Sequence, residues 1–180
     1  RPTDRISIVT YAGSAKIALE GGDATEKADI LSVIQGLEAG GSTAGASGIS
    51  LAYEVASRNF IDGGNNRIIL ATDGDFNVGM NSVSDLEDFI ESKKATGVFF
   101  SVLGFGTGNI RDDIMESLAD HGNGVYYYID SIKEAEKVFI HQLGGSMIMV
   151  AKDVKLQIEF NPALVKGYRL IGYENRVLDY

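Results

Sequence analysis

The sequence predicts an α/β fold: a doubly wound, mostly parallel sheet with helices on both faces, plus a short C-terminal antiparallel β segment. Two observations predict this fold. The hydrophobic period switches repeatedly between two residues and about 3.6 residues, so strands alternate with helices. Two predicted strands, Arg67–Thr72 and Val98–Gly104, are nearly continuous apolar runs, which is typical of strands covered on both faces. Alternation of this kind requires crossover connections and therefore parallel strands.

Composition excludes several classes of protein. The 180 residues are 44% hydrophobic and 23% charged, which is ordinary for a globular chain and excludes a disordered one. The absence of cysteine excludes disulfides, thiolate zinc sites and cysteine nucleophiles. The net charge of −9 repels phosphate backbones, so we expect no nucleic-acid partner. No apolar run reaches the roughly 18 residues of a transmembrane helix, so we expect no membrane insertion within this chain.

The first half of the chain predicts two strands, two helices and a third strand. Residues 5–11 are rich in β-branched side chains, and residues 16–20 form a second strand that we expect to end at Gly21. Apolar residues at helical spacing predict one helix from Ala28 to about residue 37 and another over residues 49–60. The most apolar strand, Arg67–Thr72, follows.

The second half repeats the pattern. A capping box at Ser84–Glu87 opens a helix that Gly97 ends, because a Ser–x–x–Glu pattern satisfies two helix N–H groups reciprocally. A second buried strand, a short helix, a tyrosine-rich strand and a last helix follow, at residues 98–104, 111–121, 124–130 and 131–143. Three consecutive tyrosines in the third of these should alternate between the two faces of the sheet.

The pattern changes near Ala151. Apolar residues alternate with polar ones over residues 154–160 and again over 168–174, with a break at Asn161-Pro162. We therefore expect a first domain over residues 1–147 and the beginning of a C-terminal β module over residues 148–180.

Three loops are candidates for chemistry, since ligands bind open α/β sheets beyond the carboxyl ends of the strands. They are Gly40–Gly45, Thr72–Asp75 and Gly104–Gly108. Each alone is also explained as a turn or a helix cap. The third loop lacks the glycine spacing of a dinucleotide site, and the chain contains neither a P-loop nor a Gly-x-Ser-x-Gly elbow. Together, the Thr and Asp oxygens of the first two loops suit Mg²⁺.

These loops and the strands around them resemble a known family. In order and spacing, Ile6–Tyr11, Gly41–Thr43, Arg67–Gly74 and Val98–Gly106 are similar to a von Willebrand factor type A domain, over about residues 3–147. The tail resembles the segment that follows this domain in bacterial A-domain proteins that are envelope-associated or secreted. The resemblance thus implies an extracytoplasmic location, although no localisation signal is present in this chain.

The resemblance implies a metal-ion-dependent adhesion site (MIDAS) on the sheet top. In this family an Asp-x-Ser-x-Ser motif, a Thr and an Asp hold the metal, and an acidic partner side chain fills its open position. Thr43 matches the family's Thr and Asp73 its Asp; Gly41 and Gly74 shape the two loops. The implied cofactor is Mg²⁺ or Mn²⁺, and the implied partner is a protein that presents a carboxylate.

The sequence departs from the family in one large respect, because Asp-x-Ser-x-Ser is absent. We expect the family's first strand and helix to lie upstream of Arg1, and this chain alone to bind Mg²⁺ weakly or not at all. Ser42 and Asp75 are weaker candidate ligands. Without that strand, residues 5–11 and 67–72 would have unpaired edges. A second copy through self-association, the C-terminal strands, closure of the sheet or upstream residues could fill the gap.

The functional prediction is therefore a non-catalytic, metal-dependent protein-binding or adhesion domain of a bacterial envelope or secreted protein. One alternative is a structural domain whose metal site is dead. Another is a metal-dependent hydrolase that uses Asp73 and Asp75, since paired carboxylates can hold Mg²⁺ for phosphoryl chemistry. The sequence shows no positioned base and no phosphate-clamping Lys or Arg nearby, so we do not expect an enzyme.

Overall fold

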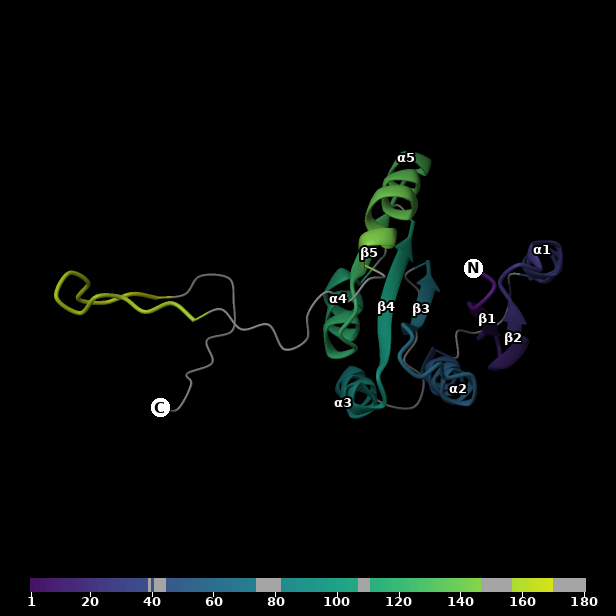
Figure 1. Ribbon diagram of the computed structural model, residues 1–180, viewed down its shortest axis with the longest axis horizontal. Helices are drawn as coiled ribbons and strands as arrows, with labels where there is room; N and C mark the ends of the chain where they lie inside the picture. Colours follow the sequence, from purple (N-terminus) through teal and green to yellow (C-terminus); the bar gives the residue numbers. More distant parts are fainter. Residues whose placement is uncertain (39, 41–44, 74–81, 107–110, 147–156, 170–180) are drawn as a thin grey trace. The chain divides into compact units, whose positions relative to one another are not determined.

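The computed structural model describes residues 1–38, 40, 45–73, 82–106, 111–146 and 157–169. The chain divides into two compact units, Arg1–Met149 and Val150–Tyr180. The first unit contains a two-stranded sheet, a three-stranded sheet and the helices that pack on them (Figure 1). In the described part of the chain, no helix is both long and apolar enough to cross a membrane.

The larger sheet is parallel, as the sequence predicts. It consists of β3 (Asn66–Thr72), β4 (Val98–Phe105) and β5 (Tyr126–Ile129), in the order β3-β4-β5. The pairing of β3 with β4 runs without a shift from Asn66 opposite Val98 to Thr72 opposite Gly104. The carboxyl ends of these strands therefore lie at one edge of the sheet.

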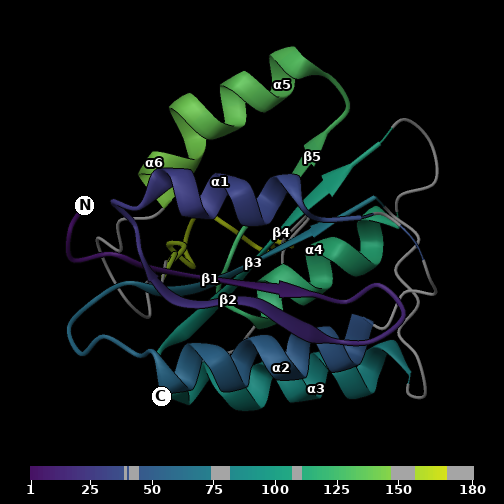
Figure 2. The ribbon, with the colours of Figure 1, turned by 90° about the vertical axis from the view of Figure 1, so that its right-hand side faces the viewer.

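Helices cover both faces of this sheet, which confirms the doubly wound α/β class. The larger core includes side chains of α2 (Gly45–Arg58), α3 (Val83–Lys93) and α4 (Asp112–His121). After α3 comes the 3-10 helix η1 (Lys94–Thr96). A smaller cluster of Leu103, Ile129 and Val138 forms under the last helix, whose consecutive segments are α5 (Ile132–Glu136), η2 (Lys137–Gln142) and α6 (Leu143–Ser146). Figure 2 shows α5 on one side of the strands and α2 with α3 on the other.

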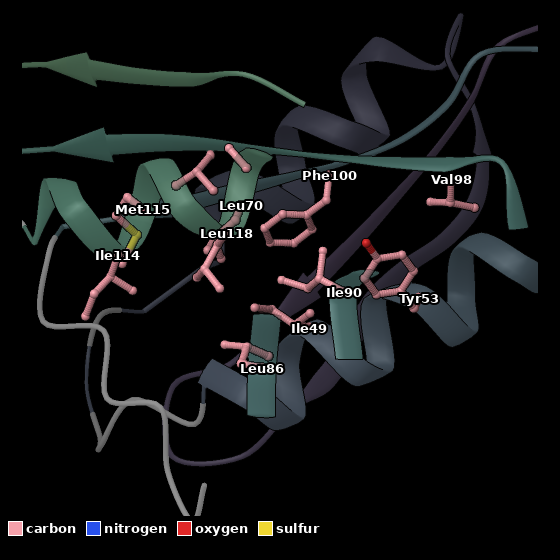
Figure 3. Close-up of a cluster of buried hydrophobic side chains, with 12 residues drawn as sticks. Ile49, Tyr53, Leu70, Leu86, Ile90, Val98, Phe100, Ile114, Met115 and Leu118 are labelled. Atoms are coloured by element: carbon pink, nitrogen blue, oxygen red, sulfur yellow. The ribbon is translucent and has the colours of Figure 1, made fainter. Parts of the chain in front are cut away.

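The larger core is centred on Phe100 of β4, whose side chain is fully buried among residues from α2, α3 and α4 (Figure 3). The Tyr53 ring stacks near it, with centroids 6.1 Å apart, and meets Phe89 edge to face at 5.8 Å. The buried members of this core are Ile49, Tyr53, Leu70, Leu86, Ile90, Val98, Phe100, Val102, Ile114, Met115, Leu118 and Ala119.

The smaller sheet is an antiparallel pair of β1 (Arg5–Thr10) and β2 (Lys16–Asp23). The prediction that the second strand ends at Gly21 is wrong, because the strand continues to Asp23. Gly21 adopts φ 60°, and its N–H donates to the Ser7 hydroxyl at 2.9 Å, where the pairing register shifts. A β-bulge favours glycine at such a left-handed position, so this glycine bends the strand rather than ending it. The helix that follows, α1 (Lys27–Gln35), buries none of its side chains.

The capping box of α3 differs from the predicted one by two residues. The Ser82 hydroxyl accepts from the Asp85 N–H at 3.2 Å, and the Asp85 carboxylate accepts from the Ser82 N–H at 3.0 Å. The prediction at Ser84–Glu87 is therefore wrong. Both registers fit a Ser–x–x–acid pattern. The observed one begins the helix at Val83, whose side chain packs against the core.

The two apolar strands, β3 and β4, differ in how deeply their side chains are buried. In β4, Val98 and residues 100–104 are all buried, as predicted. In β3, Leu70 and Thr72 are buried, but Ile69 is 38% exposed and Ala71 is also exposed. The prediction that β3 is covered on both faces is therefore wrong. In the described residues β4 lies between two strands, whereas β3 has one neighbour.

The described part of the second unit contains a turn at residues 162–164, and the chain on either side of it has no regular secondary structure. The Asn161 side chain accepts from the Ala163 N–H at 2.9 Å, and the rings of Phe160 and Tyr168 lie 4.5 Å apart across the turn. Residues 157–169 contain no strand, whereas the sequence pattern predicts strands up to residue 160 and from residue 168. Ile158 is 69% exposed, so the described residues bury too little apolar surface to hold a sheet.

Candidate functional site

The candidate site lies where β3 ends. Thr72 is the last residue of β3, and Asp73 follows it with an exposed side chain. Asp73 is the predicted metal contact that the structure describes. The other predicted residues, Gly41, Ser42, Thr43, Gly74 and Asp75, lie outside the described residues.

Tyr11 connects the end of β1 to this edge. Its hydroxyl donates to the Ala71 carbonyl of β3 at 2.7 Å, across 60 residues of sequence. Helix α2 packs against both β1 and β3. A Cβ added at Gly48 of α2 would lie 2.6 Å from the Cβ of Tyr11, so only glycine permits this approach. The ends of β1 and β3 thus lie at one edge of the molecule, at the start of the helix that follows the predicted Thr43 loop.

The side chains of Tyr11, Thr72 and Asp73 interact with one another at this edge. Burial raises the pKa of the Tyr11 hydroxyl, and the negative charge of Asp73 raises it further, while a hydrogen bond with the Thr72 side chain opposes both effects. Tyr11, Thr72 and Asp73 are therefore neighbours. Sequence reasoning found Asp73 as a metal contact and the candidate loop that begins at Thr72, but it missed Tyr11 as a site residue. The available signal was that Tyr11 is a polar side chain at the end of a β-branched run.

Among the described residues, the oxygen atoms at this edge are too few to hold a metal ion by themselves. Mg²⁺ demands near-octahedral coordination by oxygen. Within the described residues, no group of three or more His, Asp or Glu side chains converges closely enough to hold a metal ion. Asp73 contributes one exposed carboxylate, and the Thr72 hydroxyl is already engaged by Tyr11. The described donors have the right chemistry for a hard cation but are too few, so a complete site requires further oxygen ligands.

A separate groove of about 330 Å³ lies between α2 and α3. Its charged groups are largely engaged already: Arg58 pairs with Glu20 at 2.7 Å, and the Lys93 ammonium lies 5.0 Å from the Phe89 ring centroid. Its residues are Ser50, Tyr53, Glu54, Ser57, Arg58, Phe89 and Lys93. Figure 3 shows Tyr53 near Val98, where β4 begins, so this groove is at the opposite end of the strands from Asp73.

The histidines do not contribute to the candidate site. His121 ends α4, and its Nδ1 lies 2.8 Å from the Ser117 carbonyl oxygen within the same helix. His141 is exposed in η2. Neither histidine is therefore a candidate base for Asp73, and both placements agree with ordinary structural roles for these side chains.

Sequence comparisons identify the same organisation. The family model of the von Willebrand factor type A domain matches residues 1–141, and the family model "Uncharacterized protein YfbK, C-terminal" matches residues 145–180. A curated relative, "Uncharacterized protein YfbK" of Escherichia coli (strain K12), is 49% identical over 178 residues. The match covers 99% of this chain but 31% of that relative, so the chain spans about a third of the relative's length.

Solved structures share the fold of the first unit. BatB from Bacteroides thetaiotaomicron has a TM-score of 0.60 at 20% identity, with 79% of each chain covered. An aerotolerance-related membrane protein from Bacteroides fragilis has a TM-score of 0.60 at 19% identity, with 81% of each chain covered. Proximal thread matrix protein 1 from the mussel byssus, with a zinc-occupied MIDAS motif, has a TM-score of 0.61 at 25% identity, over 79% of this chain and 35% of that one. The fold and the family match agree, and the chain belongs to the von Willebrand factor type A domain family.

Proposed function

We propose that the carboxyl edge of β3 is part of a metal-ion-dependent site that binds a protein partner. Asp73 and Thr43 contribute metal contacts, with Ser42 and Asp75 as weaker ones, and Gly41 and Gly74 shape the loops. The single observation that carries this proposal is the position of Asp73. It is an exposed carboxylate at the carboxyl end of a parallel strand, beside the ends of β1 and β3 that Tyr11 joins.

The chemistry of that position favours a hard cation. Carboxylate and hydroxyl oxygens are the ligands of Mg²⁺ and Mn²⁺. A structural relative from the mussel byssus holds zinc in its MIDAS motif, which supports a divalent cation at the equivalent edge of this fold. Asp73 and the other proposed contacts would hold the ion, and its positive charge would attract a carboxylate of the partner. We propose Mg²⁺ as the ion.

The proposed role is binding without catalysis. Asp73 has no described histidine beside it, since His121 lies against Ser117 in α4 and His141 is exposed in η2. An acidic chain also disfavours phosphate substrates, because its net charge is −9. We place the longer protein at the bacterial envelope or outside the cell. Support comes from the fold shared with a membrane protein of Bacteroides fragilis.

Direct metal titration tests the proposal. Mn²⁺ binding is followed by electron paramagnetic resonance, on this chain and on a form extended at its N-terminus. The extension adds about 40 residues, enough for one strand and one crossover helix. Asp73→Ala is compared with Asp130→Ala, a matched control because Asp130 is also an exposed carboxylate directly after a parallel strand.

The expected result is Mn²⁺ binding by the extended form that Asp73→Ala weakens by about tenfold or more, a loss at least as large as that of an outer-shell partner. Asp130→Ala should leave the affinity unchanged. Immobilised peptides that carry Asp, but not their Asn counterparts, should then capture the metal-loaded protein, and EDTA should release it. Equal affinity in both variants would remove Asp73 from the site. Absence of binding in the extended form would favour a purely structural domain, and turnover of a phosphate ester abolished by Asp73→Ala would favour the hydrolase.

A further inference from the structure

The Tyr11 hydroxyl makes two hydrogen bonds at the end of β3. It donates to the Ala71 carbonyl oxygen at 2.7 Å. Its bond with the Thr72 side chain lowers the pKa of the Tyr11 hydroxyl, against the effect of burial. A hydrogen bond lowers the pKa of a phenol when it stabilises the phenolate, so the Thr72 hydroxyl is the donor. Ala71 and Thr72 end β3 and Asp73 follows them directly, so Tyr11 holds the backbone from which the proposed metal contact leaves the sheet.

The base of the same side chain packs against α2. A Cβ added at Gly48 would lie 2.6 Å from the Cβ of Tyr11 and 3.1 Å from its Cγ, so the helix backbone lies directly against the tyrosine. Gly48 is buried in the first turn of α2, which begins at Gly45. In the sequence, Gly45 comes two residues after Thr43, the second proposed metal contact. Tyr11 therefore lies between the end of β3 and the start of the helix that follows the Thr43 loop.

The separation of these two segments matters for a metal site. Mg²⁺ requires near-octahedral oxygen ligands at about 2.0–2.1 Å, so two ligands from different loops must be held at one separation. Side chains that orient metal ligands without touching the metal typically contribute about 10-fold to 100-fold in affinity. Helix α2 packs on β3, and Tyr11 contacts both elements. Its position is therefore that of a group that orients ligands.

We propose that Tyr11 is a positioning residue of the metal site, which fixes the separation between Asp73 and the Thr43 loop. The inference rests on the proposed function and adds to it a residue from the end of β1. The ring acts as a spacer against Gly48, and the hydroxyl anchors the last two residues of β3. Because the hydroxyl is engaged by β3, Tyr11 acts on the metal through Asp73 and is not itself a ligand.

Mn²⁺ binding to the N-terminally extended form tests the role of the hydroxyl. Tyr11→Phe removes the hydroxyl but keeps the ring against Gly48, and it should weaken Mn²⁺ binding by about tenfold in electron paramagnetic resonance titrations. Tyr128→Phe is the matched control, because the Tyr128 hydroxyl also donates to a backbone carbonyl, that of Gly106, at 2.8 Å, after β4. It should leave the affinity unchanged. The high-field spectrum of bound Mn²⁺, which reports the geometry of its ligands, should change in Tyr11→Phe alone.

Thermal unfolding in EDTA separates this role from a general loss of stability. Each substitution removes one hydrogen bond to a backbone carbonyl, so each should lower the Tm by about 2–4 °C. A purely structural role for Tyr11 predicts two similar losses in Tm and two unchanged affinities for Mn²⁺. That result would overturn the proposal.

A double-mutant cycle shows whether Tyr11 acts through Asp73. In the Asp73→Ala background, Tyr11→Phe should weaken the remaining Mn²⁺ binding by less than about twofold, whereas a full tenfold loss would mean that the two residues act independently and would overturn the inference. If Asp73→Ala weakens binding but Tyr11→Phe does not, the positioning role fails and the proposed function stands. If Asp73→Ala leaves binding unchanged, the proposed function fails and the positioning role fails with it.

Discussion

Strands β3 and β4 have similar apolar sequences and lie side by side, yet their surroundings differ. Phe100 of β4 is 0% exposed, whereas Ile69 of β3 is 38% exposed. Both strands run from charged or polar chain into glycine-rich loops. The difference lies in their neighbours, since β4 has a strand on each side and β3 has one among the described residues. An apolar run therefore predicts that a strand is to be buried, but not how far its neighbours among the described residues bury it.

Truncating Phe100 and Ile69 to alanine should give the largest difference in the free energy of unfolding. Phe100→Ala removes a fully buried ring from the main core and should reduce the free energy of unfolding by about 3–5 kcal/mol. Ile69→Ala removes a partly exposed side chain and should cost about 1 kcal/mol or less. Urea unfolding measures both. Similar losses in the free energy of unfolding for the two variants would mean that β3 is as deeply buried as β4. That result would contradict the difference described between the two strands.

Gly48 tests how closely α2 packs against Tyr11. Gly48→Ala puts a methyl group 2.6 Å from the Cβ of Tyr11 and should destabilise the chain by about 1–3 kcal/mol through overpacking. In an open helix the same change would stabilise by about 1 kcal/mol. Gly144→Ala in α6 is the control, because its Cβ would meet nothing within 4 Å. A stabilising Gly48→Ala would mean that α2 does not press on Tyr11, and the seam between β1 and β3 would then be looser than described.

Removing the N-terminal cap of α3 should have a smaller effect on stability. Ser82→Ala removes the side-chain acceptor of the α3 capping box and should cost about 1 kcal/mol. Ser84→Ala, in the register that the sequence pattern also allows, should cost only a few tenths. Thermal unfolding of the two variants separates the registers. A larger loss at Ser84 would place the start of α3 two residues later and contradict the observed cap.

The smallest effect concerns a polar atom inside the covered core. Within the described residues the buried Tyr53 hydroxyl has no hydrogen-bond partner, so Tyr53→Phe should leave stability at pH 7 unchanged or raise it by about 1 kcal/mol. Burial raises the pKa of Tyr53 above its usual value of 10.0. The folded state therefore holds this proton more tightly, and its contribution to stability is present below pH 10 and is lost at higher pH. Urea unfolding at pH 7 and above pH 10 should show a shallower alkaline loss in Tyr53→Phe; an equal loss would assign the transition to other groups.

Much of the fold was predictable because its signals are local. Periodicity located the strands and helices of the first unit, and the apolar runs located the parallel strands β3 and β4. The errors arose where local signals are degenerate. Gly21 reads equally as a strand end or a bulge, and Ser82 and Ser84 both begin a Ser–x–x–acid pattern. Only tertiary packing decides between such alternatives.

The candidate site was less predictable. Asp73 follows an apolar strand directly, so topology alone places it at the carboxyl edge. Tyr11 meets Ala71 across 60 residues, and no spacing rule predicts such a contact. The exposure of Ile69 was also not predictable, because it depends on what packs on that face of β3 rather than on the sequence of β3 itself.

Thermal unfolding with and without Mg²⁺ tests the central claim, which is that Asp73 belongs to a metal site that this chain alone leaves incomplete. The samples are this chain and the extended form. Metal at about 100 times its dissociation constant stabilises by about 2.7 kcal/mol, or about 5–10 °C for a chain of this size. A shift of that size in the extended form, and little or none in this chain, is the predicted result. A comparable shift in this chain alone would contradict the claim and show that its own residues complete the site.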